Sequence, residues 1–345
     1  MKLWEKPFGE FQGKPVTLYH LEASDGAYAE ILTYGAIIRT ICVPDKNGVL
    51  GEVIGGVENA EELFTRRGAC SAIVIGRFAN RIAGAGYDYK GRHYSLESNP
   101  RSSRPMTMHG GSGNYSSKLF DGSAQCDGEE AKVLLRYHDD GQGGFPGEME
   151  VQVTYTFTEQ HQLFLDYDLL PSEDTPFSVT NHCYFNLAGR HGKVIDNLLL
   201  KIHADFFTPN DADTVPTGEI RPVEGTPFDF RDHKAMGEAL SCDYEQLNLF
   251  GGFDHNFCIR GRGYRPFVEA KDPESGRKLT VMSDMPGMQF YTCNHRPDLN
   301  NEHRFFCFET QNYPNSPNIG HFPSPFLPGG KPFHSRTAFL FSIEK

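Results

Sequence analysis

Apolar and polar residues alternate with a period of two along much of this chain. The clearest example is Glu148–Thr158, in which nearly every second residue is apolar. The apolar face of this segment consists of Met149, Val151, Val153, Tyr155 and Phe157. Successive side chains of a strand point to opposite faces of a sheet, so the segment is predicted to be a half-buried β-strand. The polar break Glu159–His161 separates it from Leu163–Leu170, and together they predict a β-hairpin.

Similar patterns recur along the chain, separated by turn-forming sequences rich in Gly, Asn and Asp. Further strands are expected at Ala27–Tyr34, Lys132–His138, Leu198–Ala204, Lys278–Met282, Phe305–Glu309 and Ala338–Ile343. Only short helices are expected, at Asn59–Phe64 and Asp243–Asn248, because 36 Gly and 22 Pro leave little room for long ones. Strands that do not alternate with helices favour packed antiparallel sheets over a parallel α/β fold.

No linker, low-complexity run or internal repeat divides the 345 residues. An all-β fold of more than about 200 residues is often one unit, so a single domain over residues 1–345 is the simplest expectation. Hydrophobic residues make up 38% of the chain, yet no stretch approaches the roughly 20 apolar residues of a membrane helix. The first ten residues lack the apolar core of a signal peptide, which favours a cytoplasmic protein that does not bind membranes.

The net charge of -12 argues against nucleic acid as a partner, because phosphate binding requires clustered Lys and Arg. A neutral small molecule is compatible with such a surface. The eight cysteines include no CxxC pair, and a chain of this length without a signal peptide does not need a disulfide framework. We therefore expect them to be reduced and mostly buried.

Two segments combine glycines with polar side chains suited to binding a ligand. Gly76–Gly84 holds Arg77, Asn80 and Arg81, whose guanidinium and amide groups make directional hydrogen bonds to hydroxyls. Met108–Gly111 places His109 beside two glycines, which allow close approach of the backbone to a ligand. Judged on residue types alone, the favoured interpretations are solvated arginines in an exposed turn and a structural or solvated histidine.

Two further segments place ionisable groups among apolar residues. His182 lies in the apolar and aromatic stretch Val179–Gly189, where a core histidine bonded to a carbonyl is the alternative. Glu309 shares a predicted strand face with Phe305 and Cys307. A carboxylate in such a row needs a partner or a raised pKa, which makes Glu309 a candidate catalytic group; a buried structural ion pair is the alternative.

Two last candidates are Asp254, just after the pair Gly251–Gly252, and Gln289, between Met288 and Phe290. Either fits a polar site, and either fits an ordinary turn or strand.

Taken in order, these segments resemble the aldose 1-epimerase family. The resemblance is carried by Gly76–Gly84, Met108–Gly111, Gly144–Gly147, Asn181–Gly189, Pro216–Glu219, Gly225–Arg231, Gly252–Asn256, Pro286–Thr292 and Glu309–Asn318. It implies a large twisted antiparallel β-sandwich, the galactose mutarotase-like supersandwich, with a sugar cleft and few short helices. It also implies that Glu309 is the base, that His182 is the acid and that His109 lies beside the ring oxygen. The positions that match the family's sugar-binding groups are Asn80, Arg81, Asp254 and Gln289.

Two stretches depart from the family's pattern. After His109 the family usually shows Gly–Phe and then Trp, whereas this chain reads Gly113–Phe120 and has its only Trp at position 4. Near Gln289 the family often has Tyr–Thr–Gly–Asn, whereas here Cys293 replaces the glycine and His295–Asp298 follows. Such differences bear on which sugar the cleft accepts, with galactose and glucose the first candidates.

Interconversion of anomers requires the C1 hydroxyl to lose a proton while the ring oxygen gains one. One base and one acid suffice, so no metal and no organic cofactor is expected. Ordinary Glu and His side chains differ by about two pKa units, so Glu309 is expected to be ionised at neutral pH. A nearby carboxylate, from Glu309 or Asp254, is expected to keep His182 charged.

Other functions remain open from the sequence. A carbohydrate-binding protein without turnover needs Arg81, Asp254 and Gln289 but not Glu309. A glycoside hydrolase would use Asp254 and Glu309 as a carboxylate pair about 5 to 10 Å apart. A metal site of His109, His182 and Glu309 matches no short ligand motif. If the protein is an aldose 1-epimerase, the expected partner is a small-molecule aldose, bound by a monomer or a homodimer.

Overall fold

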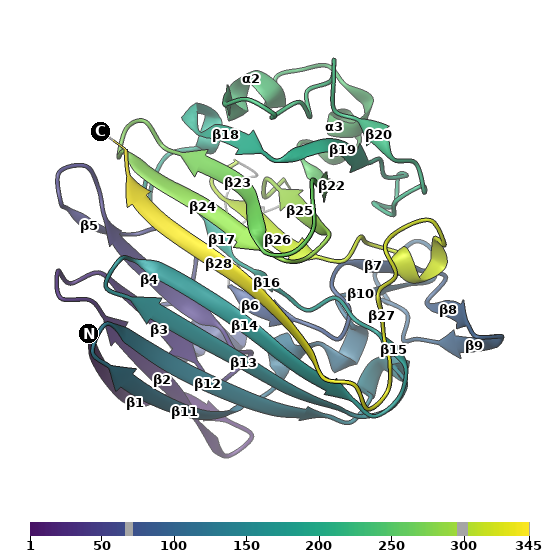
Figure 1. Ribbon diagram of the computed structural model, residues 1–345, viewed down its shortest axis with the longest axis horizontal. Coiled ribbons are helices and arrows are strands. Elements are labelled where there is room, and N and C mark those ends of the chain that lie inside the picture. Colours follow the sequence, from purple (N-terminus) through teal and green to yellow (C-terminus); the bar gives the residue numbers. More distant parts are fainter. Residues whose placement is uncertain (66–71, 295–302, 345) are drawn as a thin grey trace.

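The computed structural model describes residues 1–65, 72–294 and 303–344, which form layers of antiparallel sheet (Figure 1). Within these residues, one layer is a sheet of nine strands. Its order is β11 (Asp121–Asp127), β12 (Glu130–Asp139), β13 (Met149–Thr158), β14 (Gln162–Pro171), β28 (Phe333–Ile343), β24 (Arg277–Ser283), β23 (Arg265–Lys271), β18 (Leu199–Ile202) and β21 (Lys234–Ala235). The alternating hydrophobic pattern of the sequence is clearest in this layer.

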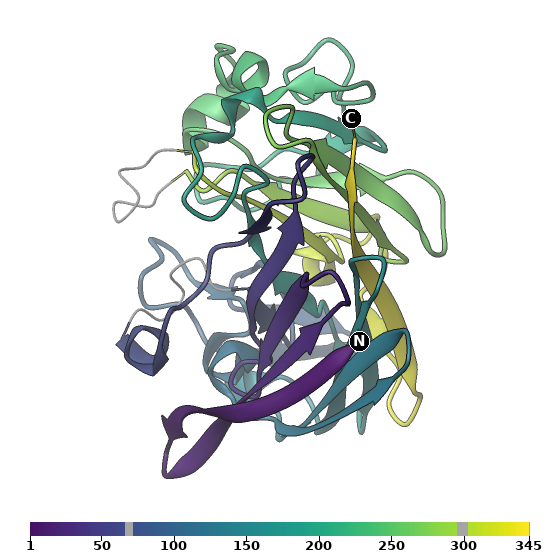
Figure 2. The ribbon, with the colours of Figure 1, turned by 90° about the vertical axis from the view of Figure 1, so that its left-hand side faces the viewer.

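Two more sheets lie against this layer (Figures 1 and 2). A five-stranded sheet consists of β1 (Lys2–Phe11), β2 (Lys14–Glu22), β3 (Tyr28–Leu32), β4 (Ile38–Pro44) and β5 (Leu50–Glu52). A six-stranded sheet runs in the order β17 (Tyr184–Phe185), β26 (Phe306–Gln311), β25 (Gly287–Tyr291), β22 (Asp254–Ile259), β19 (Ala204–Thr208) and β20 (Arg221–Pro222). The ribbon of β6 (Ile73–Ile75) and β16 (Thr180–His182) lies between them, next to β26.

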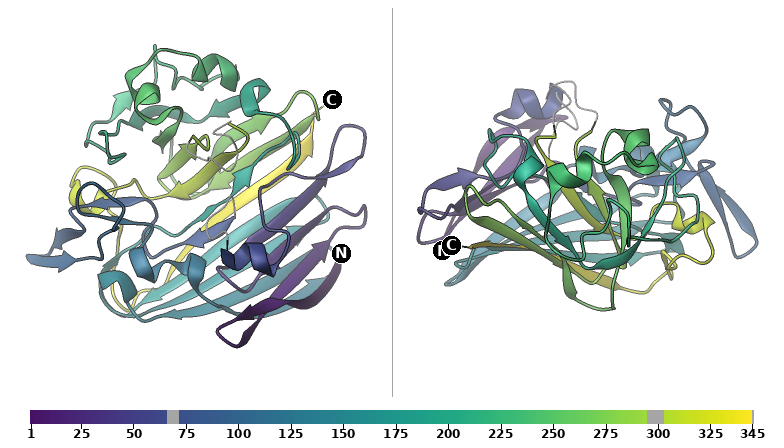
Figure 3. Two further views of the ribbon diagram at one scale, coloured as in Figure 1. Left: turned by 180° about the vertical axis from the view of Figure 1, so that it is seen from behind. Right: turned by 90° about the horizontal axis from the view of Figure 1, so that it is seen from above.

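Smaller elements surround the sheets (Figure 3). The remaining two-stranded ribbons are β7 (Arg81–Ala83) with β10 (Met106–Met108), β8 (Gly86–Tyr89) with β9 (Arg92–Ser95), and β15 (Thr175–Pro176) with β27 (Phe326–Leu327). The helices are α1 (Ala60–Thr65), α2 (Met236–Leu240) and α3 (Glu245–Phe250). Short 3-10 turns are η1 (Gly111–Gly113), η2 (Tyr115–Ser117), η3 (Gln142–Gly144), η4 (Ile195–Asn197) and η6 (Ser316–Asn318).

The predicted hairpin is confirmed as β13 and β14, with Phe157 opposite Leu163. Every apolar residue of the predicted β13 face is at most 2% exposed, whereas Glu150 between them is exposed. The predicted helices appear as α1 and α3, displaced by one or two residues, and α2 was not predicted. The all-β, antiparallel fold class is therefore correct, because the period-two pattern correctly indicates which side chains face the core.

The largest cluster of buried apolar side chains draws on strands from Tyr19 to Phe341 and thus on all three large sheets. Among the described cysteines, Cys42, Cys183, Cys293 and Cys307 are buried, whereas Cys126 is exposed. Cys70 and His295–Asp298 lie outside the described residues. No helix among the described residues is long and apolar enough to span a membrane.

Candidate active site

Three polar side chains stand next to one another on the six-stranded sheet. Glu309 on β26 is the ladder partner of Gln289 on β25, and each is only 2% exposed. Asp254, the first residue of β22, pairs with Tyr291, two residues beyond Gln289 on the same strand. Side chains directly opposite or two residues apart share a sheet face, so all three project from the same side.

Gln289 holds Asp254 in place. Its Nε2 donates a hydrogen bond of 2.6 Å to Oδ1 of Asp254. Asp254 borders the cavity above the sheet, whereas Gln289 does not and lies beneath it. The family resemblance implies that both residues bind the sugar. In the structure, Gln289 instead lies where it orients the carboxylate of Asp254.

His182 comes from the ribbon beside the sheet. It ends β16, which packs against β26, and its Nε2 lies 3.5 Å from Oε1 of Glu309. The ring of Tyr184 stacks on its ring at 4.8 Å between centroids and an interplanar angle of 20°. The two candidate proton-transfer groups, 127 residues apart in sequence number, therefore meet in a geometry fixed by strand packing and ring stacking.

The two arginines of Gly76–Gly84 have different surroundings. Arg77 is 1% exposed, and its guanidinium donates to Asp139 at 2.9 Å and to the carbonyls of Pro146 and Gly147. It is a buried structural residue, so neither alternative weighed for this segment, a ligand-binding group or a solvated arginine in an exposed turn, describes Arg77. Arg81 and Asn80 do border the cavity, and Arg81 Nη1 donates to Asn80 Oδ1 at 3.3 Å.

His109 is held in one tautomer. The backbone N–H of Asn80 donates to His109 Nδ1 at 3.1 Å, so the neutral ring carries its proton on Nε2. Burial lowers the pKa of His109 well below its ordinary value, and the nearby His182 and Arg81 lower it further. His109 is therefore a neutral hydrogen-bond donor, as suits a group beside a sugar oxygen.

Burial also changes the charge expected for Glu309. Loss of solvation raises the pKa of this carboxyl well above its ordinary value, the Asp254 carboxylate raises it further, and Arg81 opposes the shift. The ionised form of Glu309 is therefore less favoured than the sequence analysis expected. A carboxyl whose pKa is raised in a cleft is typical of acid–base catalysis.

These side chains surround a cavity of about 270 Å³. Its lining residues are Asn80, Arg81, Met108, His109, His182, Tyr184, Thr214, Phe250, Asp254, Tyr291 and Glu309. Six of the seven site residues expected from the sequence border it, all except Gln289. Sequence reasoning missed Thr214, which lies in a loop, and Phe250, the last residue of α3, because neither belongs to a chemical motif. Tyr184 and Tyr291 lie inside segments that carry the family resemblance, but only the tertiary structure shows that they line the cavity.

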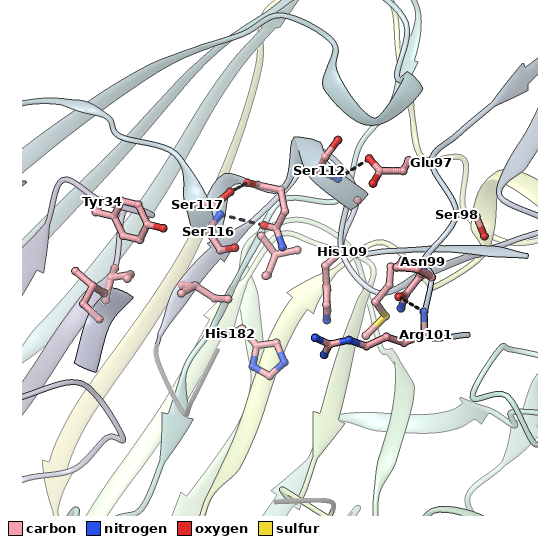
Figure 4. A pocket seen from close by; sticks show the side chains of 18 of the residues that line it. Tyr34, Glu97, Ser98, Asn99, Arg101, His109, Ser112, Ser116, Ser117 and His182 are labelled. Atoms are coloured by element: carbon pink, nitrogen blue, oxygen red, sulfur yellow. Dashed lines mark hydrogen bonds between the residues drawn. The ribbon is translucent and has the colours of Figure 1, made fainter. Parts of the chain in front are cut away.

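A second cavity of about 600 Å³ adjoins the first and shares four of its lining residues, Met108, His109, His182 and Tyr184 (Figure 4). Over residues 1–65, 72–294 and 303–344, no three His, Cys, Asp or Glu side chains are grouped as a metal site requires.

Comparison with known proteins identifies the family to which the chain belongs. The sequence pattern of the family described as aldose 1-epimerase matches residues 17–340. The chain is similar to the galactose mutarotase of Sus scrofa, with 36% identity over 93% of this chain and 92% of that protein. It is similar to the Homo sapiens galactose mutarotase, with 35% identity over 97% of each chain. The solved galactose 1-epimerase of Lactobacillus acidophilus covers 100% of this chain and 99% of its own, with 25% identity and a TM-score of 0.87.

The fold is therefore that of the galactose mutarotases. The chain belongs to the aldose 1-epimerase family and is an isomerase of that family.

Proposed function

We propose that this protein interconverts the α and β anomers of a free aldose by acid–base ring opening, with Glu309 as base and His182 as acid. The observation that carries the proposal is the 3.5 Å contact between Nε2 of His182 and Oε1 of Glu309 at the wall of a cavity of about 270 Å³. A proton donor and a proton acceptor held side by side there can serve adjacent oxygens of one sugar ring.

The steps balance without any further reactant. Glu309 takes the proton of the C1 hydroxyl while His182 gives a proton to the ring oxygen, and the bond between C1 and the ring oxygen breaks. Rotation about C1–C2 in the open-chain aldehyde presents its other face. Closure then returns one proton to His182 from the attacking hydroxyl and one from Glu309 to the new C1 hydroxyl.

The raised pKa of Glu309 fits this cycle. The pair Glu309–His182 holds one proton before ring opening, on His182, and one after it, on Glu309. A carboxyl that retains a proton more readily than usual makes the second arrangement accessible. His109 donates from Nε2 to the ring oxygen, and Asn80, Arg81 and Asp254 bind the other hydroxyls.

Galactose and glucose are the proposed substrates, since the similar proteins from Sus scrofa and Homo sapiens are galactose mutarotases. The chemistry calls for no metal or organic cofactor. We also propose that residues 1–345 act as one domain, because a single apolar cluster extends from Tyr19 to Phe341.

Polarimetry of freshly dissolved α-galactose and α-glucose in weak buffer tests the proposal. We expect the wild type to accelerate equilibration far beyond buffer and Glu309→Gln to lose about 10² to 10⁴ of that rate, the usual contribution of one proton-transfer group. Sugar binding without acceleration by the wild type would instead favour a binding protein. Release of an aryl leaving group from an aryl glycoside would favour a hydrolase that uses Asp254 and Glu309.

A further inference from the structure

The second cavity is open because of how Gly113–Phe120 folds, the stretch that departs from the family's pattern. Its two aromatic residues, Tyr115 and Phe120, are buried, and the hydroxyl of Tyr115 donates to Asp139 at 2.8 Å, away from the cavity. The ring of Tyr115 lies so close to Gly76 that a Cβ there would come within 2.2 Å of it. Only smaller polar residues of this segment remain at the cavity wall, namely Asn114, Ser116 and Ser117.

The cavity has the mixed lining that a sugar requires. Tyr34, Ile37 and Ile73 supply apolar surface, and Asn99, Ser112 and Ser116 supply hydrogen-bonding groups. Hydroxyls of a sugar bind polar groups while its C–H faces pack on apolar ones. Its volume of about 600 Å³ lies in the range of roughly 300 to 1,000 Å³ typical of small-molecule sites.

Arg101 borders the second cavity. Figure 4 shows its side chain extending into the second cavity toward His109 and His182. Its guanidinium makes no hydrogen bond or ion pair with another residue in the part of the chain that the structure describes. Five N–H donors are thus available to hydroxyl oxygens of a ligand that passes the histidines.

The order of atoms in a pyranose ring decides which part of the substrate faces this cavity. With C1 at Glu309 and the ring oxygen at the histidines, C5 and its C6 arm lie on the far side of the ring oxygen from C1. His109 and His182 border both cavities. The 6-hydroxyl is therefore the substituent nearest to the second cavity.

We propose that the second cavity binds a further sugar unit attached to the 6-position of the reducing aldose. The inference rests on the function proposed above and names its substrate class: a reducing disaccharide with a 1→6 linkage. Asn99, Arg101 and Ser116 hydrogen-bond the hydroxyls of the second unit, which packs on Ile73 and Tyr34.

Isomaltose and maltose provide the test, because both consist of two glucose units and differ in linkage, 1→6 against 1→4. We expect kcat/KM for isomaltose to exceed the values for maltose and for glucose by about tenfold, mainly through KM, as one or two added hydrogen bonds would give. If glucose is accelerated and isomaltose has no advantage over maltose, the inference is wrong and the proposed function stands. If no sugar is accelerated, the proposed function itself fails.

A filling substitution locates the effect in the cavity. Ser116→Trp should remove the advantage of isomaltose while the kcat/KM for glucose stays within about twofold of wild type, because Ser116 borders only the second cavity. Ser116→Ala keeps the cavity open but removes one hydroxyl, so it should lower the advantage only in part, because Asn99 and Arg101 still bind the second unit. Ser123→Trp, on the exposed face of β11, is the matched surface control. An equal loss for glucose and isomaltose in Ser116→Trp, with the surface control unchanged, would overturn the inference.

Discussion

Two glutamate–histidine pairs on different sheets of this protein have opposite surroundings. Glu150 on β13 and His138 on β12 lie 2.6 Å apart, with side chains 64% and 52% exposed. Glu309 and His182 lie 3.5 Å apart, with side chains 3% and 11% exposed. The exposed pair is the shorter contact, yet water and salt screen it and it contributes little. Burial, not contact distance, distinguishes these two pairs.

The electrostatic consequences follow the same division. The hydrogen bond to Glu150 raises the pKa of His138, as a solvated ion pair does. In the cavity, loss of solvation dominates: it raises the pKa of Glu309 and lowers that of His109. The charged form of His138 is thus favoured at the exposed pair, whereas the charged forms of Glu309 and His109 are disfavoured in the cavity.

Replacing Glu309 and Glu150 in turn should give the largest difference in activity. Glu309→Gln should lower kcat by about 10² to 10⁴ because the base is lost, whereas Glu150→Gln should leave kcat within about twofold. Initial rates with α-galactose and far-UV circular dichroism of both variants would measure this. A similar loss in both would mean that Glu309 acts through the fold rather than in the reaction.

Replacing Gln289 and Gln152, each of which donates to a carboxylate, should give a smaller difference in activity. Gln289 donates to Asp254 at 2.6 Å in the site, and Gln152 donates to Asp168 at 3.3 Å on the nine-stranded sheet. Gln289→Leu should raise KM about tenfold to a hundredfold with a lesser effect on kcat, since a hydrogen bond to a charged group is typically worth about 1.5 to 3 kcal/mol. Gln152→Leu should leave both constants unchanged. An effect on kcat alone in Gln289→Leu would contradict a binding role for Asp254.

The pH dependence sharpens the comparison for Glu309. As the base, Glu309 must lose its proton, so the acid limb of kcat/KM should lie above the ordinary glutamate pKa. The rate should fall again above neutrality, when the pair has lost its single proton. Rates from pH 4 to 10 measure both limbs. A flat profile from pH 6 to 9 would count against His182 as the acid.

Stability should respond to the same group with a definite sign. A carboxyl with a raised pKa in the folded state stabilises the fold at pH values below its unfolded-state pKa. That stability is lost as the pH rises through the folded-state pKa. Glu309→Gln should abolish this loss, so its stability relative to wild type should increase from pH 4 to pH 8. Urea unfolding across this range, with Glu150→Gln as control, would show a constant difference if the prediction is wrong.

The smallest effect is expected at His138. Its raised pKa adds stability that is complete at low pH and is lost as the pH rises through the folded-state pKa. Because the pair is exposed, His138→Gln should cause only a slight loss at low pH, which vanishes in high salt, and no change in kcat. Unfolding at pH 5 and pH 9 in low and high salt would measure it; a loss that persists in salt would mean packing rather than charge.

The sequence by itself determined the class of fold and most of the site. Alternation located the β13–β14 hairpin because a half-buried strand repeats every two residues. It did not locate α2, whose five residues are too few for a helical period. Polar groups in apolar segments, together with family resemblance, identified Glu309, His182, His109, Asn80, Arg81 and Asp254, which all border the cavity.

Only the tertiary structure decided which of two similar residues lies in the candidate active site. Arg77 and Arg81 are four residues apart, yet Arg77 is buried and donates to Asp139, whereas Arg81 borders the cavity. Glu150 and Glu309 both lie on strands, yet only the latter is buried beside a histidine. These outcomes depend on strand register and on contacts between residues far apart in sequence, 62 positions for Arg77 and Asp139 and 127 for His182 and Glu309. Such contacts bring side chains together and exclude water. Solvation, and therefore pKa and reactivity, is set at that level because it depends on everything that surrounds a group.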